Sequence, residues 1–216
     1  MMHEKDAAGH RLKFSAMNLA PITLAGRSLK LEPLGPEHRA GLARAADDPS
    51  IFRYVSADLT RPAELDAWLE RAAKARDAGR ELAFAIIGLA DKEVMGSARY
   101  MNIEPLHRRL EIGWIWLARK RWGGPYAIEC NLLLLAHAFE ALKCHRVEYR
   151  TDVLNFRSQR MIEGLGARRE GLFRRHMVMQ EGRVRDTLQY ALIDEDWPQA
   201  KARLEERLAR RLGLPP

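Results

Sequence analysis

One stretch of the chain, residues 111–129 with the sequence EIGWIWLARKRWGGPYAIE, limits the possible folds more than any other. It opens with β-branched and aromatic residues at 112–117, which are typical of a strand buried on at least one face. After Trp122-Gly123-Gly124-Pro125, residues 126–142 form an apolar run that lacks glycine and proline and is too long for a strand. The sequence therefore predicts a strand that leads through a tight glycine turn into a mostly buried helix.

The glycine turn also has the composition of an anion-binding site. Glycine lets the chain turn tightly and lets backbone N–H groups approach a ligand without a Cβ in the way. Pro125 suits the first helical turn, because its missing N–H would have no intrahelical partner there. The helix N-terminus favours an anion such as a pyrophosphate, and Arg119, Lys120 and Arg121 add positive charge just upstream. An ordinary strand-to-helix turn would also use glycine and proline, so this segment alone leaves both interpretations open.

Length and composition restrict the class of protein. A chain of 216 residues with 47% hydrophobic content can form one well-packed domain. The 36 basic and 29 acidic residues give a net charge of +7, which favours acidic ligands or partners. Charges of both signs are too mixed, at 30% of residues, for a protein that coats nucleic acid. No histidines or cysteines have metal-ligand spacing, so we expect no metal site.

Cysteine usage and hydropathy indicate the compartment. Cys130 and Cys144 fall at opposite ends of the predicted helix, roughly 20 Å apart, and cannot pair within one subunit. The N-terminal residues do not resemble a signal peptide, and no apolar stretch is long enough to span a bilayer. We therefore expect a cytoplasmic protein that does not bind a membrane.

The periodicity along the chain predicts an α/β fold. Residues 1–20 are expected to be a mobile leader, 21–197 one domain, and 198–216 a basic C-terminal helix and tail. Thr60 is expected to cap the second helix. The expected elements are a strand pair at 22–34, helices at 36–47 and 61–78, strands at 82–87, 94–101 and 109–117, the helix at 126–142, a half-exposed strand at 146–153, a helix at 155–165, strands at 167–173 and 186–193, and a helix at 196–212. This order predicts a mixed sheet with helices on both faces.

A pyrophosphate turn after the third strand of a meander resembles the GCN5-related N-acetyltransferases (GNAT), and more narrowly their RimJ/RimL-like branch. The resemblance covers about residues 22–197 and implies a largely antiparallel central sheet. The family's loop, Gln/Arg-x-x-Gly-x-Gly/Ala, aligns here with residues 120–125, KRWGGP, in which only the central glycine is unchanged. Pro125 offers no N–H, and one lost charge-assisted bond costs about 1.5–3 kcal/mol. The resemblance implies that acetyl-CoA is held by Lys120 and by backbone N–H groups of Trp122, Gly123, Gly124, Tyr126 and Ala127.

A second segment, residues 155–166 with the sequence NFRSQRMIEGLG, resembles the branch's Asn-x-x-Ser-x-x-x-x-Glu-x-x-Gly signature. The resemblance implies that Asn155 binds the pantetheine arm of the coenzyme. It also implies that Ser158 lies near the departing thiolate, where we expect it to supply a proton. Taken alone, Asn155 is equally a good helix N-cap, and the two roles are compatible.

The resemblance also points to a base and an oxyanion site. Glu111 matches a position where RimL-like relatives carry a carboxylate proposed as the base, acting directly or through water. Its alternative is a surface carboxylate beside Arg108 and Arg109. The family splays its sheet after this position, which implies that N–H groups of Ile115, Trp116 and Leu117 hold the thioester oxygen.

Several other side chains favour structural interpretations. Aromatic residues at strand positions, here Trp114, Trp116 and Trp122, belong to a core more often than to a substrate pocket. His176 is expected in a solvated basic hairpin, and His137 is expected to be a hydrogen-bonded core histidine.

The sequence thus favours an acetyl-CoA-dependent N-acetyltransferase that acetylates a primary amine, on a protein N-terminus or a small molecule, by direct attack in a ternary complex. The alternative is a catalytically impaired binding module of the same fold, which Pro125 suggests. A nucleic-acid-associated protein is disfavoured, because no aromatic residues are interleaved with the basic ones near 168–175.

Residues 46–59 and 174–185 are expected to select the acceptor, and their arginines favour an acidic one. The Trp- and Leu-bearing C-terminal helix could pack on a second subunit and form a homodimer.

Overall fold

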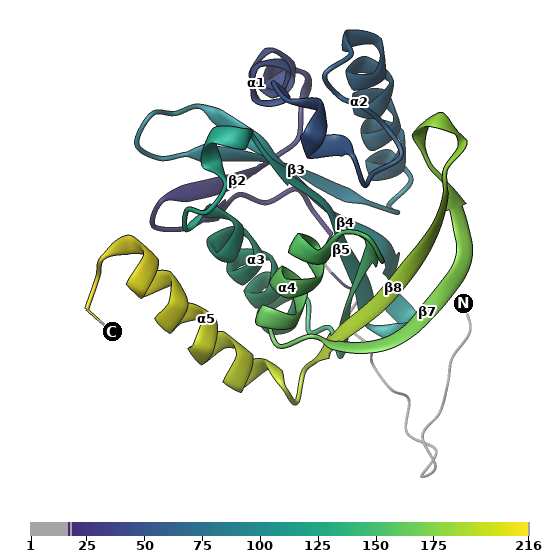
Figure 1. Cartoon of the computed structure of the whole chain (residues 1–216). Helices are drawn as coiled ribbons and strands as arrows, with labels where there is room; N and C mark the ends of the chain where they lie inside the picture. Colours follow the sequence, from purple (N-terminus) through teal and green to yellow (C-terminus); the bar gives the residue numbers. More distant parts are fainter. Residues whose placement is uncertain (1–16, 18, 216) are drawn as a thin grey trace.

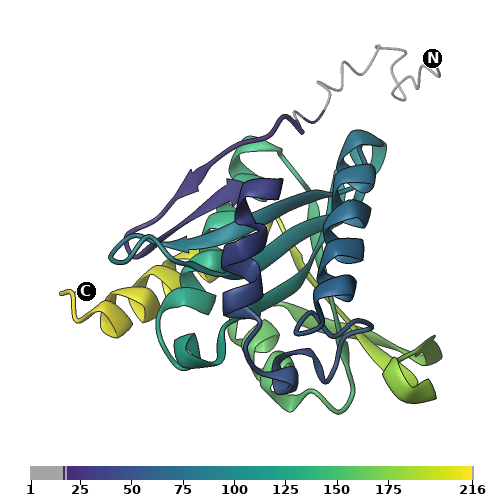
Figure 2. The same cartoon turned by 90° about the horizontal axis from the view of Figure 1, so that it is seen from above.

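The protein is built around one eight-stranded sheet with helices on both faces (Figures 1 and 2). The computed structural model describes residue 17 and residues 19–215, so most of the expected leader lies outside the described residues. The strands lie in the order β1-β2-β3-β4-β5-β6-β8-β7, and every neighbouring pair is antiparallel except β5 and β6. This mixed, largely antiparallel sheet confirms the predicted fold class.

The strands follow the predicted order, and β4, β7 and β8 are longer than expected. Their bounds are Leu24–Ala25 (β1), Leu29–Pro33 (β2), Leu82–Gly88 (β3), Val94–Glu104 (β4), Arg109–Leu117 (β5), Arg146–Asp152 (β6), Arg168–Val178 (β7) and Val184–Ile193 (β8). The helices are Arg39–Ala45 (α1), Pro62–Asp77 (α2), Tyr126–Ala136 (α3), Phe156–Gly164 (α4) and Trp197–Leu212 (α5). Short 3₁₀ turns include Pro49–Phe52 (η2), Arg119–Arg121 (η4) and Gln180–Gly182 (η6).

Strand β3 shows how the sheet divides the core into two layers. All seven of its residues are buried, and they alternate between the two faces. Leu82, Phe84 and Ile86 join the larger apolar cluster with α3, α4 and α5. Ala83 and Ala85 face the smaller cluster under α1 and α2, where their size lets those helices approach the sheet closely.

A buried carboxylate fixes the start of α3. Glu129, 1% exposed, accepts hydrogen bonds from the backbone N–H groups of Arg27 and Ser28 and from the Ser28 hydroxyl. A Cβ on Gly26 would lie 2.4 Å from Glu129 Oε1, so this turn requires glycine. These bonds tie the β1–β2 turn to the first turns of α3 and hold that helix in register with the sheet.

Three local expectations are corrected. The N-cap of α2 is Arg61 rather than Thr60. Glu64, in the first turn of α2, accepts a hydrogen bond from the Asp58 N–H. The long helix changes after α3 into a π-helical turn, His137–Ala141 (η5). Strand β6 is not half-exposed, because Glu148 and Asp152 are buried. They contact Arg146 and Arg150 of the same strand, Arg109 of β5, and Arg183 just before β8.

Helix α5 packs on the core of its own chain. Trp197, Leu204 and Leu208 are buried in the larger cluster, so the apolar face that we expected to be available to a second subunit is covered here. Within residues 19–215, no helix has the length and apolar character needed to cross a lipid bilayer.

Candidate active site

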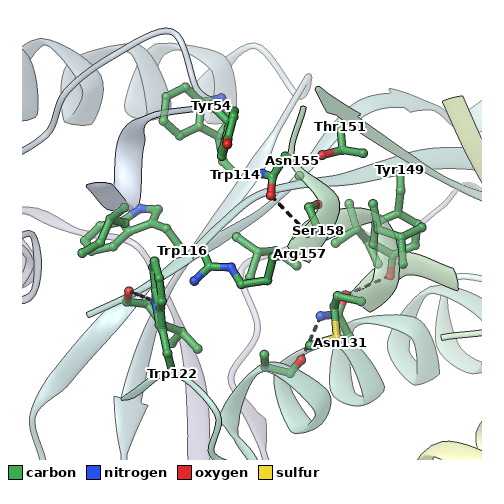
Figure 3. A pocket seen from close by; sticks show the side chains of 18 of the residues that line it. Tyr54, Trp114, Trp116, Trp122, Asn131, Tyr149, Thr151, Asn155, Arg157 and Ser158 are labelled. Carbon is green, nitrogen blue, oxygen red and sulfur yellow. Dashed lines mark hydrogen bonds between the residues drawn. The ribbon is translucent and has the colours of Figure 1, made fainter. Parts of the chain in front are cut away.

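The sheet opens between its two parallel strands. Strands β5 and β6 pair at only three positions, and the last pair is Glu111 with Glu148. Beyond it, residues 112–117 of β5 and 149–152 of β6 diverge and line a cavity of about 340 Å³ (Figure 3). The splay that the family resemblance implied is therefore present, and it creates a pocket between the two strands.

A bulge in β5 produces the divergence. Between Arg99 and Ser97 of β4, the partner strand runs from Gly113 to Trp116 and so carries one extra residue. Trp114 takes up this residue with a left-handed φ of 49°. Opposite the bulge, a Cβ on Gly96 would lie 1.9 Å from the carbonyl oxygen of Trp116, so only glycine fits. The bulge bends β5 away from β6.

The bulged segment forms one wall of the pocket. Ile115, Trp116 and Leu117 all line it, and their edge facing β6 has no strand partner in the register of the described sheet. The structure thus brings the predicted oxyanion donors to the cavity, and their role stays a prediction. Trp114 and Trp116 both pack in the core and line the pocket, with the Trp116 ring 5.2 Å from Phe52. Trp114 and Trp116 therefore combine the core role and the pocket role that the sequence left as alternatives.

The glycine turn forms one end of the pocket. Gly123 has a φ of 80°, a left-handed conformation that glycine adopts without strain. The N–H groups of Gly123 and Gly124 meet no backbone acceptor among the described residues, whereas the N–H of Trp122 donates to the Arg119 oxygen at 3.2 Å. Trp122 N–H, which we expected to be available, is thus used within the turn.

Helix α3 begins directly after the turn. Pro125 is its N-cap, and the Pro125 carbonyl accepts the Glu129 N–H at 3.0 Å. The N–H groups of Tyr126 and Ala127 lie in the first turn of the helix, where such groups have no intrahelical acceptor. Ala127 also lines the pocket. Pro125 therefore leaves four backbone N–H donors at this end of the pocket, those of Gly123, Gly124, Tyr126 and Ala127.

Arginines from two distant segments surround this end. Arg121, Arg207 and Arg211 line the pocket, and Arg211 Nη1 donates to the Gly123 oxygen at 3.1 Å. Arg207 donates to the Gly164 oxygen at the end of α4. Lys120 instead binds Glu93 at 2.8 Å, and it is not among the lining residues. The spacing of Arg207 and Arg211, one helical turn apart, was visible in the sequence, but nothing there placed α5 beside the turn.

Helix α4 presents Asn155 and Ser158 to the pocket (Figure 3). Asn155 is the N-cap, and its Oδ1 accepts the Ser158 N–H at 3.1 Å. The amide Nδ2 of Asn155 and the hydroxyl of Ser158 make no hydrogen bond with any residue of the described chain. The capping role is thus confirmed, and the same side chain keeps a free donor for a ligand.

Arg157 is a pocket residue that the sequence analysis missed. Its guanidinium carbon lies 3.2 Å from the centre of the Trp122 ring, and that of Arg119 lies 4.0 Å from it. The indole N–H of Trp122 donates to the Leu117 oxygen at 2.9 Å, which fixes the ring (Figure 3). Burial lowers the pKa of Arg157 from its usual range. Because the motif treats position 157 as a spacer, no sequence signal singled it out.

Glu111 is buried beside the pocket rather than in it. The residue is only 5% exposed. Its carboxylate accepts a hydrogen bond from Asn102 Nδ2 at 2.7 Å and lies 3.4 Å from Arg150 Nε. Burial raises its pKa, against the opposing effect of Arg150. The surface-carboxylate alternative is therefore wrong. A Cβ on Gly113, which lines the pocket, would lie 3.5 Å from Glu111 Oε1, so the carboxylate reaches the edge of the cavity.

The other end of the pocket lies beside a contact between two loops. Gln180, at the tip of the β7–β8 hairpin, donates through Nε2 to the oxygens of Phe52 and Val55 at 3.3 and 3.1 Å. Tyr54 and Arg185 line the pocket at this end. Both segments expected to select the acceptor, 46–59 and 174–185, thus reach the cavity.

Two histidines lie outside the site, as predicted. His176 is exposed on the hairpin, with Nδ1 3.1 Å from Thr187 Oγ1. His137 stacks on Tyr100, and its Nδ1 lies 3.2 Å from the Tyr100 hydroxyl. Neither histidine lines the pocket.

A sheet splayed at its single parallel joint, with a glycine turn and a helix N-terminus at the opening, is the arrangement of a protein that binds a phosphate-bearing ligand. Comparison with known families agrees: the model described as an acetyltransferase (GNAT) domain matches residues 28–168. The chain therefore belongs to the GNAT family of acetyltransferases, whose members use acetyl-CoA.

Individual relatives agree with this assignment. The "uncharacterized N-acetyltransferase p20" of Bacillus licheniformis is 25% identical over 81% of this chain and 98% of its own length. A GCN5-related N-acetyltransferase of Brucella melitensis, solved by crystallography, is 32% identical, with a TM-score of 0.80 over 89% of this chain and 90% of its own. RimJ of Mycobacterium smegmatis, solved in complex with CoA-disulfide, is 27% identical, with a TM-score of 0.75 over 89% of this chain and 96% of its own.

Proposed function

We propose that this acetyltransferase moves the acetyl group of acetyl-CoA to a primary amine by direct attack in a ternary complex. The observation that carries the proposal is one cavity with two different ends, a basic glycine turn at one and the acceptor-selecting loops at the other. Because both ends open into the same space, the thioester and the amine can meet without a covalent enzyme intermediate.

The residues present fit the coenzyme. The unpaired N–H groups of Gly123 and Gly124, the first turn of α3, and the lining arginines of α5, Arg207 and Arg211, suit a diphosphate, whereas Arg121 is already paired with Asp91 and Glu93. The free Nδ2 of Asn155 suits a carbonyl of the pantetheine arm. When bound, the coenzyme supplies the activated acetyl group.

The remaining pocket groups have proposed roles in the transfer. A C–N bond forms to the amine while the C–S bond breaks, so the amine must lose a proton and the thiolate must gain one. Glu111, with its raised pKa, accepts the proton through water at Gly113, and the Ser158 hydroxyl supplies one to the thiolate. Within Ile115, Trp116 and Leu117, a backbone N–H that faces the open β6 side holds the thioester oxygen as it gains negative charge.

The two cysteines support direct attack. Cys130 and Cys144 are buried, and neither lines the pocket. Burial raises the pKa of Cys144 to about 12, so at neutral pH it is a protonated, unreactive thiol. No cysteine of the described chain is therefore placed to carry the acetyl group.

Residues 155–166 and the likeness to RimJ support the RimJ/RimL-like branch. The competing proposal is a binding module that has lost the chemistry, for which Pro125 was the main argument. The free N–H groups on both sides of Pro125 weigh against it.

Thermal unfolding with acetyl-CoA, followed by kinetics, tests the proposal. Coenzyme at about a hundred times its Kd should stabilise the fold by about 2.7 kcal/mol. That is about 5–11 °C for a chain of this size. Initial rates of thiol release should then give intersecting lines when both substrates are varied. No thermal shift would reject coenzyme binding, and parallel lines would reject the ternary complex.

A further inference from the structure

One charged side chain at this loop-lined end of the pocket forms no ion pair within the described residues. Arg185 is only 8% exposed, yet it lines the cavity. Its Nη1 donates to the Tyr54 carbonyl at 3.4 Å, a long and weak bond, and its Nε has no partner among the described residues. No carboxylate in residues 19–215 lies within 4.0 Å of it.

Neighbouring arginines differ from Arg185 in this respect. Arg150 lies 3.4 Å from Glu111 and 3.6 Å from Glu148. Arg183 pairs with Asp152, whose other oxygen accepts the Leu154 N–H at 2.9 Å, while Asp152 and Glu111 act on Arg185 only from beyond ion-pair distance. The acidic groups near Arg185 are thus held by other partners, and their pairing leaves this guanidinium facing the cavity unpaired.

A buried guanidinium without an anion is unfavourable, and arginine does not escape the cost by losing its proton. Burial lowers the pKa of Arg185 from its usual range, which is in line with this environment. A guanidinium also presents donors in a planar fork that matches the two oxygens of a carboxylate. The missing counter-ion is therefore expected to arrive with a ligand.

The loop contact at this end limits the size of that ligand. The hairpin tip is joined by the two bonds of Gln180 to Phe52 and Val55, which line the cavity together with Arg185. A folded protein substrate would have to separate these segments, whereas a small molecule fits beneath them.

We propose that Arg185 binds a carboxylate of the acceptor, so that the amine acetylated by this enzyme is a small molecule of the amino-acid type. This inference rests on the proposed function, because it names the acceptor of the same pocket. Arg185 acts here as a residue that selects the substrate, and it takes no part in bond making.

The test compares matched acceptors. Common amino acids and their decarboxylated amines are offered with acetyl-CoA, together with aminoalkyl phosphates and a short peptide with a free N-terminus. The wild-type enzyme should show kcat/KM at least about tenfold higher for an amino acid than for its decarboxylated partner, in line with one charge-assisted bond. A preference for decarboxylated amines, peptides or aminoalkyl phosphates would overturn the carboxylate assignment.

Variants locate the effect at one side chain. Arg185→Gln should remove the preference by lowering kcat/KM for the amino acid about 10- to 100-fold, with little change for the decarboxylated amine. Arg185→Lys keeps the charge without the fork and should be intermediate. Arg44→Gln, at an exposed arginine on α1 that does not line the pocket, is the matched control and should keep the preference.

The two proposals fail in different ways. If acetyl-CoA does not stabilise the protein, the proposed function itself is wrong. If acetyl-CoA stabilises the wild type and all variants equally, but no amino acid is acetylated or Arg185→Gln affects both members of a pair alike, only the carboxylate assignment is refuted.

Discussion

Asn155 allows its two roles to be separated by choice of substitution. Its Oδ1 caps α4 through the Ser158 N–H, and its Nδ2 has no partner among the described residues. Serine is also a good N-cap but carries no amide N–H group. Asn155→Ser should therefore keep the helix and lose the ligand bond, whereas Asn155→Ala should lose both.

The magnitudes follow from typical hydrogen-bond energies. A neutral hydrogen bond contributes about 0.5–1.5 kcal/mol, so Asn155→Ser should raise the Kd for acetyl-CoA about 2- to 12-fold. Its melting temperature without ligand should stay near that of the wild type. Loss of a cap costs about 0.5–2 kcal/mol, so Asn155→Ala should also melt about 1–8 °C lower.

Two measurements check these values. Isothermal titration calorimetry gives the Kd for acetyl-CoA, and thermal unfolding of the ligand-free proteins gives the cost of the cap. If Asn155→Ser bound acetyl-CoA as tightly as the wild type, the side chain would serve only as a cap, and its proposed contact with the pantetheine arm would be refuted.

Three further substitutions test other parts of the structure. Because burial raises the pKa of Glu111, the acid limb of kcat/KM should lie above the ordinary glutamate value of about 4.3, and Glu111→Gln should abolish that limb, as a pH–rate profile would reveal. A group whose pKa is raised in the folded state contributes stability below its unfolded pKa, and this contribution is lost as the pH rises through the folded pKa. Glu111 is such a group, so Glu111→Gln should cost little stability at neutral pH. Gly96→Ala should destabilise the fold by about 2–5 kcal/mol, because the added Cβ would lie 1.9 Å from a backbone oxygen. Gly171→Ala is the control and should leave the stability unchanged, because the space around Gly171 is open. Equal denaturation midpoints for the two variants would contradict the bulge argument. Glu129→Ala should lower the melting temperature by about 4–8 °C through unpaired N–H groups at Ser28 and Arg27, and an unchanged value would mean that the β1–β2 turn does not depend on this carboxylate.

Local sequence patterns predicted much of the fold. The apolar run at 82–87 and the glycine turn at 123–124 gave the right elements, because each depends on neighbours in the chain. The N-cap role of Asn155 was predictable for the same reason. Strand β6 was judged half-exposed since its charged residues alternate, and only the fold supplies the partners that bury Glu148 and Asp152.

The rest of the site depends on contacts between distant segments. Arg211 and Gly123 are 88 residues apart, and no local pattern could place them in contact. Likewise, the polar partners of Glu111 are Asn102 of β4 and Arg150 of β6, so its burial could not be derived from its own strand. Charge and spacing identified candidate residues, but their pairing was set by topology.

The short parallel joint also has a mechanical consequence. Strands β1–β5 form one continuous ladder, and β6 pairs with β8 over seven positions, but only three pairs connect the two halves. Shear between the halves therefore meets the least resistance along this seam. A molecule that spans the opening acts as a brace across it, so the two halves of the sheet become stiffer as a unit when the pocket is filled.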